Sequence, residues 1–144
     1  MKNVAKAVKY FEDGFACSQS ILAAYCEAYG LDREIAFRLA DPFGAGMRGL
    51  SETCGAVTGS LMVIGLKYGR NQADDLEAKE KTAALILEFV KTFKDRHGTI
   101  TCKELLGYDI SIPEQYNLAE EQGLFETKCP NFVKVAAEIL EQIL

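Results

Sequence analysis

Apolar residues recur every three or four positions along most of this chain, and that spacing constrains the fold more than any other feature. The clearest case is segment 74–97, where Asp74 and Asp75 suit the positive end of a helix and Gly98 marks its other end. No segment shows the alternation of apolar and polar residues that is typical of strands. The pattern predicts an all-α fold, a compact bundle of about five to seven helices with no significant β-sheet.

The expected helices are separated by short connections. They cover residues 4–11, 18–29, 32–39, 53–68, 74–97, 102–106 and 130–144, with one further turn near 113–119. Segment 42–49 is rich in glycine, and we expect it to form a loop. A chain of 144 residues without repeats or linkers is typical of one domain, so we expect residues 1–144 to form a single helical domain.

The charge and hydropathy of the chain exclude two classes of partner. The formal net charge is −5 at pH 7, which argues against binding to the phosphates of nucleic acids. We expect no membrane insertion, because the longest apolar run, residues 56–66, is shorter than the roughly 20 residues that cross a bilayer. Segment 1–6 lacks the apolar stretch of a secretory signal, so we expect the protein in the cytoplasm.

Four of the five cysteines lie at or near the start of an expected helix. They are Cys17, Cys54, Cys102 and Cys129. The segment that begins at Thr101 and ends at Glu104 has the sequence of a capping box, and Pro130 is a residue favoured at the first position of a helix. Cysteines in a reducing compartment are seldom permanent bridges, so these four are expected to be redox groups or ligands.

The start of a helix changes the chemistry of a thiol. Unpaired backbone N–H groups and the helix dipole stabilise a thiolate there and lower the pKa of the cysteine. Among the four cysteines, Cys54 is favoured as the reactive thiolate. Several helix starts around one cavity would suit several thiolates, so we expect at least three of the four within about 10 Å of a common centre.

The fifth cysteine and the single histidine are interpreted differently. Cys26 falls in the apolar stripe of segment 18–29, which predicts a buried core thiol. His97 ends the long segment 74–97, where we expect it to stabilise the negative end of a helix and not to bind a metal.

Glycine is placed so that other parts of the chain can approach the cysteine at position 54. Gly55 and Gly59 lie four residues apart on one helix face, which predicts a close helix crossing, although each costs about 1 kcal/mol of helix propensity relative to Ala. Gly44 and Gly46 precede this element and are expected to pack around it. They do not form a phosphate loop, because no G-x-x-x-x-G-K-[ST] motif is present.

Four sequence features together resemble one known family. They are GFACSQ at residues 14–19, CGAVTG at residues 54–59, CKELLG at residues 102–107 and CP at residues 129–130. In this order, and over nearly the whole chain, they resemble the C_GCAxxG_C_C family of putative redox-active proteins. The resemblance implies redox activity that depends on the four cysteines. It also implies more glycine between residues 44 and 54 than this chain has, since Arg48 and Ser51 stand there.

These observations favour thiol–disulfide or thiol–oxidant chemistry, similar to that of a thiol–disulfide oxidoreductase, at Cys17, Cys54, Cys102 and Cys129. An alternative is that the four thiolates bind a metal ion or an iron–sulfur cluster for electron transfer, as related modules beside haem and iron–sulfur centres imply. The spacing lacks the close ligand pairs of common metal motifs, so the fold would have to assemble such a site. A third alternative is a non-catalytic helical interaction module. No cofactor or redox partner is identified, and a homodimer remains open.

Overall fold

The computed structural model describes residues 2–144, and its regular elements are helical. In chain order they are α1 (Lys2–Glu12), α2 (Cys17–Tyr25), η1 (Cys26–Tyr29), α3 (Arg33–Ala40), η2 (Asp41–Phe43), α4 (Gly44–Arg48), α5 (Gly55–Tyr68), α6 (Leu76–His97), α7 (Cys102–Leu106), α8 (Pro113–Glu121), α9 (Leu124–Thr127) and α10 (Cys129–Ile143). Residues 2–144 contain no strand, only an isolated bridge between Thr53 and Thr101. The all-α prediction is therefore confirmed.

The number of helices exceeds the five to seven that the sequence predicts. The extra elements are short: α4 and α9 span five and four residues, and η1 and η2 are 3₁₀ turns. Elements of one turn are too short for apolar periodicity to develop, so the pattern does not detect them. Segment 18–29 illustrates this, because the expected single helix ends at Tyr25 and continues as the 3₁₀ turn η1.

Local sequence explains where the main helices begin and end. The carboxylates of Asp32 and Asp75 accept hydrogen bonds from the N–H groups three residues ahead, at 3.2 Å and 3.0 Å, and so cap α3 and α6. Gly30 and Gly98 end η1 and α6 in the left-handed conformation, with φ values of 84° and 85°.

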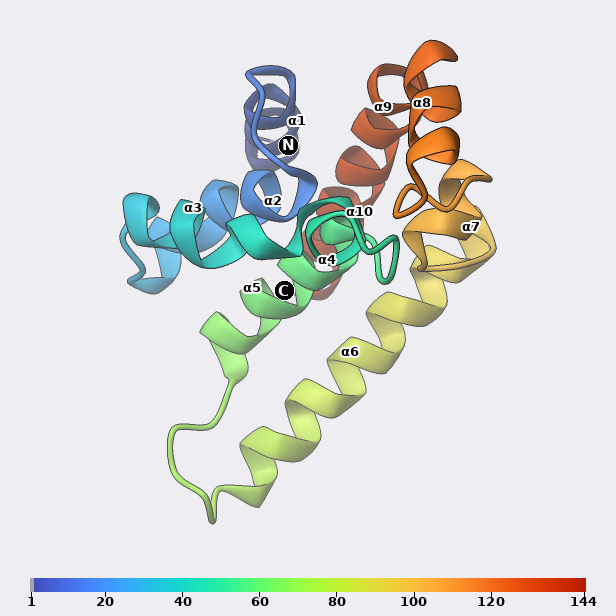
Figure 1. Ribbon diagram of the computed structural model, residues 1–144. Helices are drawn as coiled ribbons and strands as arrows, with labels where there is room; N and C mark the ends of the chain where they lie inside the picture. The colour runs from blue at the N-terminus through green and yellow to red at the C-terminus, as the bar shows by residue number, and fades with distance from the viewer. Residues whose placement is uncertain (1) are drawn as a thin grey trace.

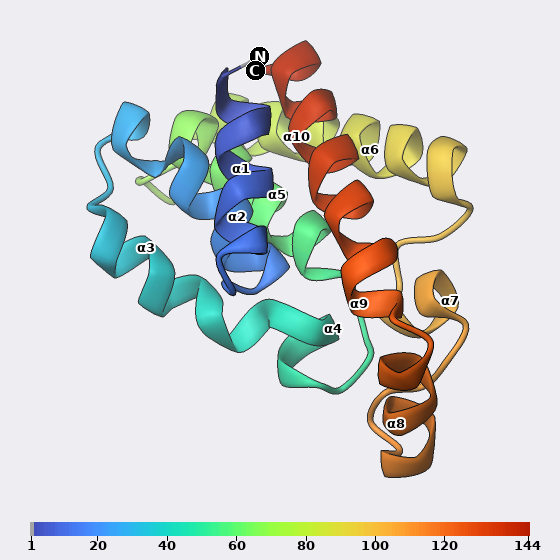
Figure 2. The same ribbon diagram turned by 90° about the horizontal axis from the view of Figure 1, so that it is seen from above.

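Helix α2 lies at the centre of the bundle. It packs against α1, α3, α5 and α10, so four helices from both halves of the chain surround it (Figure 1). Helix α6 runs along one side of α5 and α10, and its first turns extend beyond the rest of the bundle. Figure 2 shows that α7, α8 and α9 lie together at one end of the molecule, where α7 packs against α4. The part of the chain described here contains no helix long and apolar enough to cross a bilayer.

The hydrophobic core forms where these helices meet. Phe89 and Phe93 from α6 are fully buried. Ile139 and Leu140 from α10 are at most 1% exposed. Cys26 is also fully buried in this core, which confirms its interpretation as a core thiol. Its Sγ lies 3.5 Å from the carbonyl oxygen of Ala23.

The glycine-rich segment is not the open loop that the sequence predicts. After η2 it forms a left-handed helical turn, with φ values of 55° at Ala45, 67° at Gly46, 72° at Met47, 54° at Arg48 and 86° at Gly49. The N–H of Gly49 donates to the carbonyl of Ala45 at 3.0 Å and closes the turn. Left-handed backbone costs about 1–2 kcal/mol for each non-glycine residue, so surrounding contacts must hold this turn in place.

Candidate functional site

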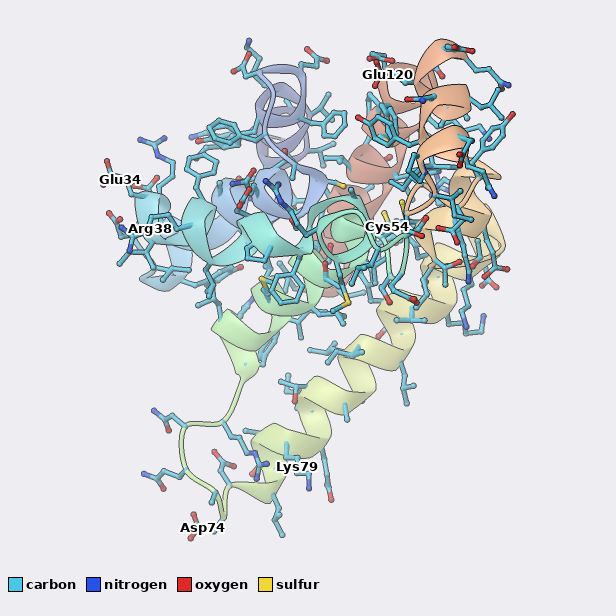
Figure 3. All side chains as sticks on the ribbon, in the orientation of Figure 1. Glu34, Arg38, Cys54, Asp74, Lys79 and Glu120 are labelled. Carbon is cyan, nitrogen blue, oxygen red and sulfur yellow. The ribbon has the colours of Figure 1, made fainter. Side chains whose placement is uncertain are left out.

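A cavity of about 350 Å³ opens where the starts of several helices meet. Its lining residues come from most of the chain. They are Phe11, Ala16, Cys17, Gly44, Ala45, Gly46, Arg48, Gly49, Cys54, Gly55, Cys102, Leu105, Leu106, Phe125, Cys129 and Phe132. All four cysteines that the sequence singles out therefore face one space, and we call it the four-thiol cavity. In Figure 3, Cys54 lies near the middle of the molecule, whereas the labelled charged residues lie at its periphery.

The four cysteines reach this cavity in a common way. Cys17, Cys102 and Cys129 are the first residues of α2, α7 and α10, and Cys54 is the residue that immediately precedes α5. The prediction that they lie at helix starts is confirmed. Cys54 and Cys102 are 5% and 7% exposed, whereas Cys17 and Cys129 are half-buried. All five cysteines of the chain are free thiols.

Cys17 has the most acidic thiol of the four. The neighbouring Cys54 thiol, which can donate toward the Cys17 sulfur, is the largest cause of a lowered pKa of Cys17. The backbone N–H groups of Ala45, Cys17 and Ser18 donate as well. These donors outweigh the desolvation of the buried sulfur and lower the pKa of Cys17 from 9.0 to about 7.

Neighbouring groups hold Cys17 in this position. Gln19 links two segments: its side-chain oxygen accepts from the N–H of Ala16 at 2.9 Å, and its amide donates to the carbonyl of Phe37 at 2.9 Å. The N–H that Ala45 aims at the sulfur belongs to the left-handed turn. The turn thus supplies part of the electrostatic environment of the thiolate.

The electrostatics of the pair favour Cys17, and not Cys54 as the sequence predicts, as the more acidic thiol. Its own thiol is the donor to Cys17, its sulfur is buried, and a charge on Cys17 lies nearby. These causes raise the pKa of Cys54 well above its ordinary value, and only the N–H of Ala56 opposes them. Because Cys17 receives three backbone N–H groups and Cys54 receives one, Cys17 is the member of the pair that ionises first.

Cys102 is held against the end of the left-handed segment. Its N–H donates to the carbonyl of Glu52 at 2.6 Å, and the buried hydroxyl of Ser51 donates to its sulfur. Burial and the charge on Cys17 nevertheless raise the pKa of Cys102 to about 11. Ser51 itself has a φ of 62°, so one strained residue outside the turn also lies beside Cys102.

The capping box expected at α7 does not form. The hydroxyl of Thr101 makes no bond to the helix backbone and instead donates to the carboxylate of Glu104 at 2.6 Å. A second hydroxyl, from Thr99, donates to the same carboxylate at 3.2 Å. The carboxylate of Glu104 is thus occupied by two neighbouring hydroxyls, and the orphan N–H groups at the start of α7 are satisfied by residues 51 and 52.

Cys129 closes the fourth side of the cavity. Burial is the main cause that raises the pKa of its thiol, and charges on Cys17 and Cys102 add to it. The pKa values of Cys102 and Cys129 are therefore raised while that of Cys17 is lowered, so Cys17 is the first of these three thiols to ionise as the pH rises.

Glycines make the close approach of these segments possible. A methyl group added at Gly55 would lie 3.0 Å from the sulfur of Cys17, and one at Gly59 would lie 2.8 Å from the carbonyl oxygen of Ser18. A methyl group at Gly46 would lie 2.8 Å from Cβ of Cys102, and one at Gly44 would lie 2.5 Å from Cβ of Ala16. Real Cβ atoms avoid such distances, so a side chain at any of the four would separate elements that carry cysteines.

Sequence reasoning missed several contributors to the site. The N–H of Ala45, the hydroxyl of Ser51 and the side chain of Arg48 all act at or beside the cavity. The only sequence signal was the glycine expected at positions 48 and 51, because both residues adopt the positive φ that glycine favours.

The donor atoms do not fit a metal site as they stand. Within residues 2–144, no three or more Cys, His, Asp or Glu side chains are grouped so that they could hold a metal ion. His97 packs its ring against Phe93 and Phe132, with centroid distances of 4.7 Å and 5.0 Å, and its Nε2 is buried without a partner. It takes no part in a ligand group with the cysteines.

A comparison with family models identifies the chain. The model for C_GCAxxG_C_C, described as a putative redox-active protein, matches residues 15–143, a span that includes all four cavity cysteines. No curated protein and no solved structure matches the chain. The sequence resemblance is therefore confirmed, and the chain belongs to the C_GCAxxG_C_C family of putative redox-active proteins.

Proposed function

We propose that this protein carries out thiol–disulfide exchange, with Cys17 as the nucleophile and Cys54 as the resolving thiol. The observation that carries the proposal is that Cys17 and Cys54 line the same open cavity, where the Cys54 thiol is the group that most lowers the pKa of Cys17. A thiol with a pKa near the ambient pH is the most effective attacking group in such exchange, and the pKa of Cys17 is about 7.

The exchange proceeds in two substitutions. The Cys17 thiolate attacks one sulfur of a substrate disulfide, so a Cys17–substrate disulfide forms, the substrate S–S bond breaks and the released sulfur takes a proton from solvent. Cys54 then loses its proton and attacks the Cys17 sulfur. The Cys17–Cys54 disulfide forms, the mixed disulfide breaks, and the second substrate sulfur is protonated. Two electrons pass from the protein to the substrate, and the reverse sequence reduces the protein again.

We assign Cys102 and Cys129 to a later exchange. They face the same cavity, and their raised pKa values keep them protonated while Cys17 reacts. A binding function for a metal or cluster is not supported by the way the described thiols are arranged.

Mapping of disulfides after mild oxidation tests the proposal. We expect the thiol-specific oxidant diamide to remove two thiols first, and peptide mass spectrometry to find them as a Cys17–Cys54 bond. Cys17→Ser and Cys54→Ser should each abolish that bond. The matched control is Cys26→Ser, since Cys26 is a thiol in the core outside the cavity. A first bond between other cysteines, or none at all, would refute the assignment.

A further inference from the structure

The walls of the four-thiol cavity other than its thiols are mainly apolar. Phe11 of α1, Leu105 and Leu106 of α7, Phe125 of α9 and Phe132 of α10 contribute side chains to it. A volume of about 350 Å³ is at the small end of the roughly 300–1,000 Å³ typical of small-molecule sites. The sulfur of Cys17 lies within this space rather than on a convex surface, so a compact apolar molecule reaches it more readily than a disulfide on a folded protein.

One charge stands beside this apolar space. Among the lining residues, all of which lie in the described part of the chain, Arg48 alone carries a charged side chain. Its guanidinium lies 3.6 Å from the carboxylate of Asp41, and the two side chains are 74% and 47% exposed. An exposed ion pair of this kind is worth little, so an anionic group can compete for the guanidinium. The left-handed turn contains both this cation and Ala45, and both line the same cavity as Cys17.

We propose that the substrate of the Cys17–Cys54 exchange is a small disulfide with an apolar body and an anionic end. The disulfide meets Cys17, the body lies against the aromatic and leucine side chains, and the anionic end meets Arg48. This inference rests on the proposed function and narrows it to one class of substrate.

A cyclic disulfide satisfies the requirement with the fewest atoms. The Cys17 thiolate opens the ring, so one substrate sulfur is bonded to Cys17 and the other leaves as a thiolate and takes a proton. Attack of Cys54 on the Cys17 sulfur then forms the protein disulfide and releases the second substrate sulfur, which is protonated. The ring disulfide gains two electrons and leaves as a dithiol, and the protein dithiol loses two.

Lipoate and lipoamide are matched probes for this idea. They share the cyclic disulfide and the apolar chain, and they differ in whether the end is a carboxylate or a neutral amide. The reduced protein is mixed with each probe, and formation of the Cys17–Cys54 bond is followed by mass spectrometry after acid quenching. We expect lipoate to react roughly 2–5-fold faster than lipoamide, the range that one exposed ion pair supports. Glutathione disulfide and insulin, which are larger and polar, should react more slowly than either.

Two substitutions locate the source of the preference. Arg48→Gln should remove the difference between lipoate and lipoamide. Arg38→Gln, which removes the same charge from the periphery of α3, should retain it. Equal rates for the two probes in the unaltered protein, or a preference that survives Arg48→Gln, would overturn the role of the anionic end. Faster reaction with insulin or glutathione disulfide would overturn the small apolar substrate. In each of these cases a Cys17–Cys54 bond formed by diamide would leave the proposed exchange intact, whereas its absence would refute the exchange itself.

Discussion

Replacing Cys54 with Ala tests the contact on which the proposed reactivity of Cys17 depends. The substitution removes the thiol that donates to the Cys17 sulfur, which is the largest cause of the lowered pKa. It leaves the three backbone N–H donors from Ala45, Cys17 and Ser18 in place. We therefore expect the pKa of Cys17 to rise from about 7 but to stay at or below its ordinary value of 9.0.

The size of this rise follows from the energy of the lost bond. A hydrogen bond to a charged group contributes about 1.5–3 kcal/mol, and one pKa unit corresponds to about 1.4 kcal/mol, so the rise is about 1–2 units. The thiolate fraction at pH 7 then falls from about one half to about 0.1 or 0.01. A more basic thiolate is intrinsically more nucleophilic, with a Brønsted slope of about 0.4–0.5, so the rate at pH 7 falls only about 2–8-fold.

The decisive measurement is therefore a pH profile and not a single rate. Alkylation of Cys17 by iodoacetamide is followed between about pH 5 and pH 11 by mass spectrometry of the peptide that contains it, a range of about 2 units around each expected midpoint. Cys26→Ala is the matched control and should leave the midpoint near 7, because Cys26 does not line the cavity. If the pH midpoint of alkylation were the same in Cys54→Ala as in the unaltered protein, the Cys54 thiol would not stabilise the Cys17 thiolate.

Three further outcomes are expected. Gly59→Ala should destabilise the fold by about 1–2 kcal/mol despite its gain in helix propensity, because the new methyl group meets backbone atoms of α2. Gly65→Ala in the same helix is the control: its methyl group meets nothing within 4 Å, so it should stabilise the fold by about 1 kcal/mol. Urea denaturation compares the two, and a Gly59→Ala variant more stable than the unaltered protein would contradict the close helix crossing. Met47→Gly should stabilise the protein by about 0.5–1 kcal/mol, since it relieves a φ of 72°, while Ala83→Gly in the right-handed helix α6 should destabilise it by a similar amount. If both substitutions shifted the melting temperature in the same direction, the result would argue against the left-handed turn. The pKa of Cys17 is about 7 in the folded state and 9.0 ordinarily, so its contribution to the free energy of unfolding grows between pH 7 and pH 9, is complete above pH 9 and is lost below pH 7. The free energy of unfolding of Cys17→Ser, measured across this range, should lack that increase. Curves of unfolding free energy against pH that run parallel for the variant and the unaltered protein would contradict the lowered pKa.

The helices were predictable wherever a long periodic pattern carried its own end signals. Segment 102–106 agrees with α7 in both bounds, and segment 74–97 differs from α6 by two residues at its start. Both end before a glycine that adopts positive φ. Their boundaries depend on residues next to one another in the chain, which is the information that a single sequence contains.

The left-handed turn and the acidity of the thiols were not predictable in this way. Ala45, Met47 and Arg48 prefer right-handed backbone, and only packing around Gly46 and the hydrogen bonds of residues 49–52 holds them otherwise. The order of the two pKa values depends on how many N–H groups reach each sulfur. One of those groups, at Ala45, comes from a distant segment, so position at a helix start could identify the cysteines without ranking them.

Thirty-six residues separate the two cysteines of the proposed pair, and they include η1, α3, η2 and the left-handed turn. A bond between Cys17 and Cys54 would enclose all of these elements in one covalent ring. Restricting the unfolded chain in this way is worth about 4 kcal/mol by loop-closure entropy, which is a large part of the total stability of an ordinary domain. Each cycle of the proposed exchange would therefore close and open a covalent ring around about a quarter of the chain. The free energy of unfolding would then differ between the oxidised and the reduced protein.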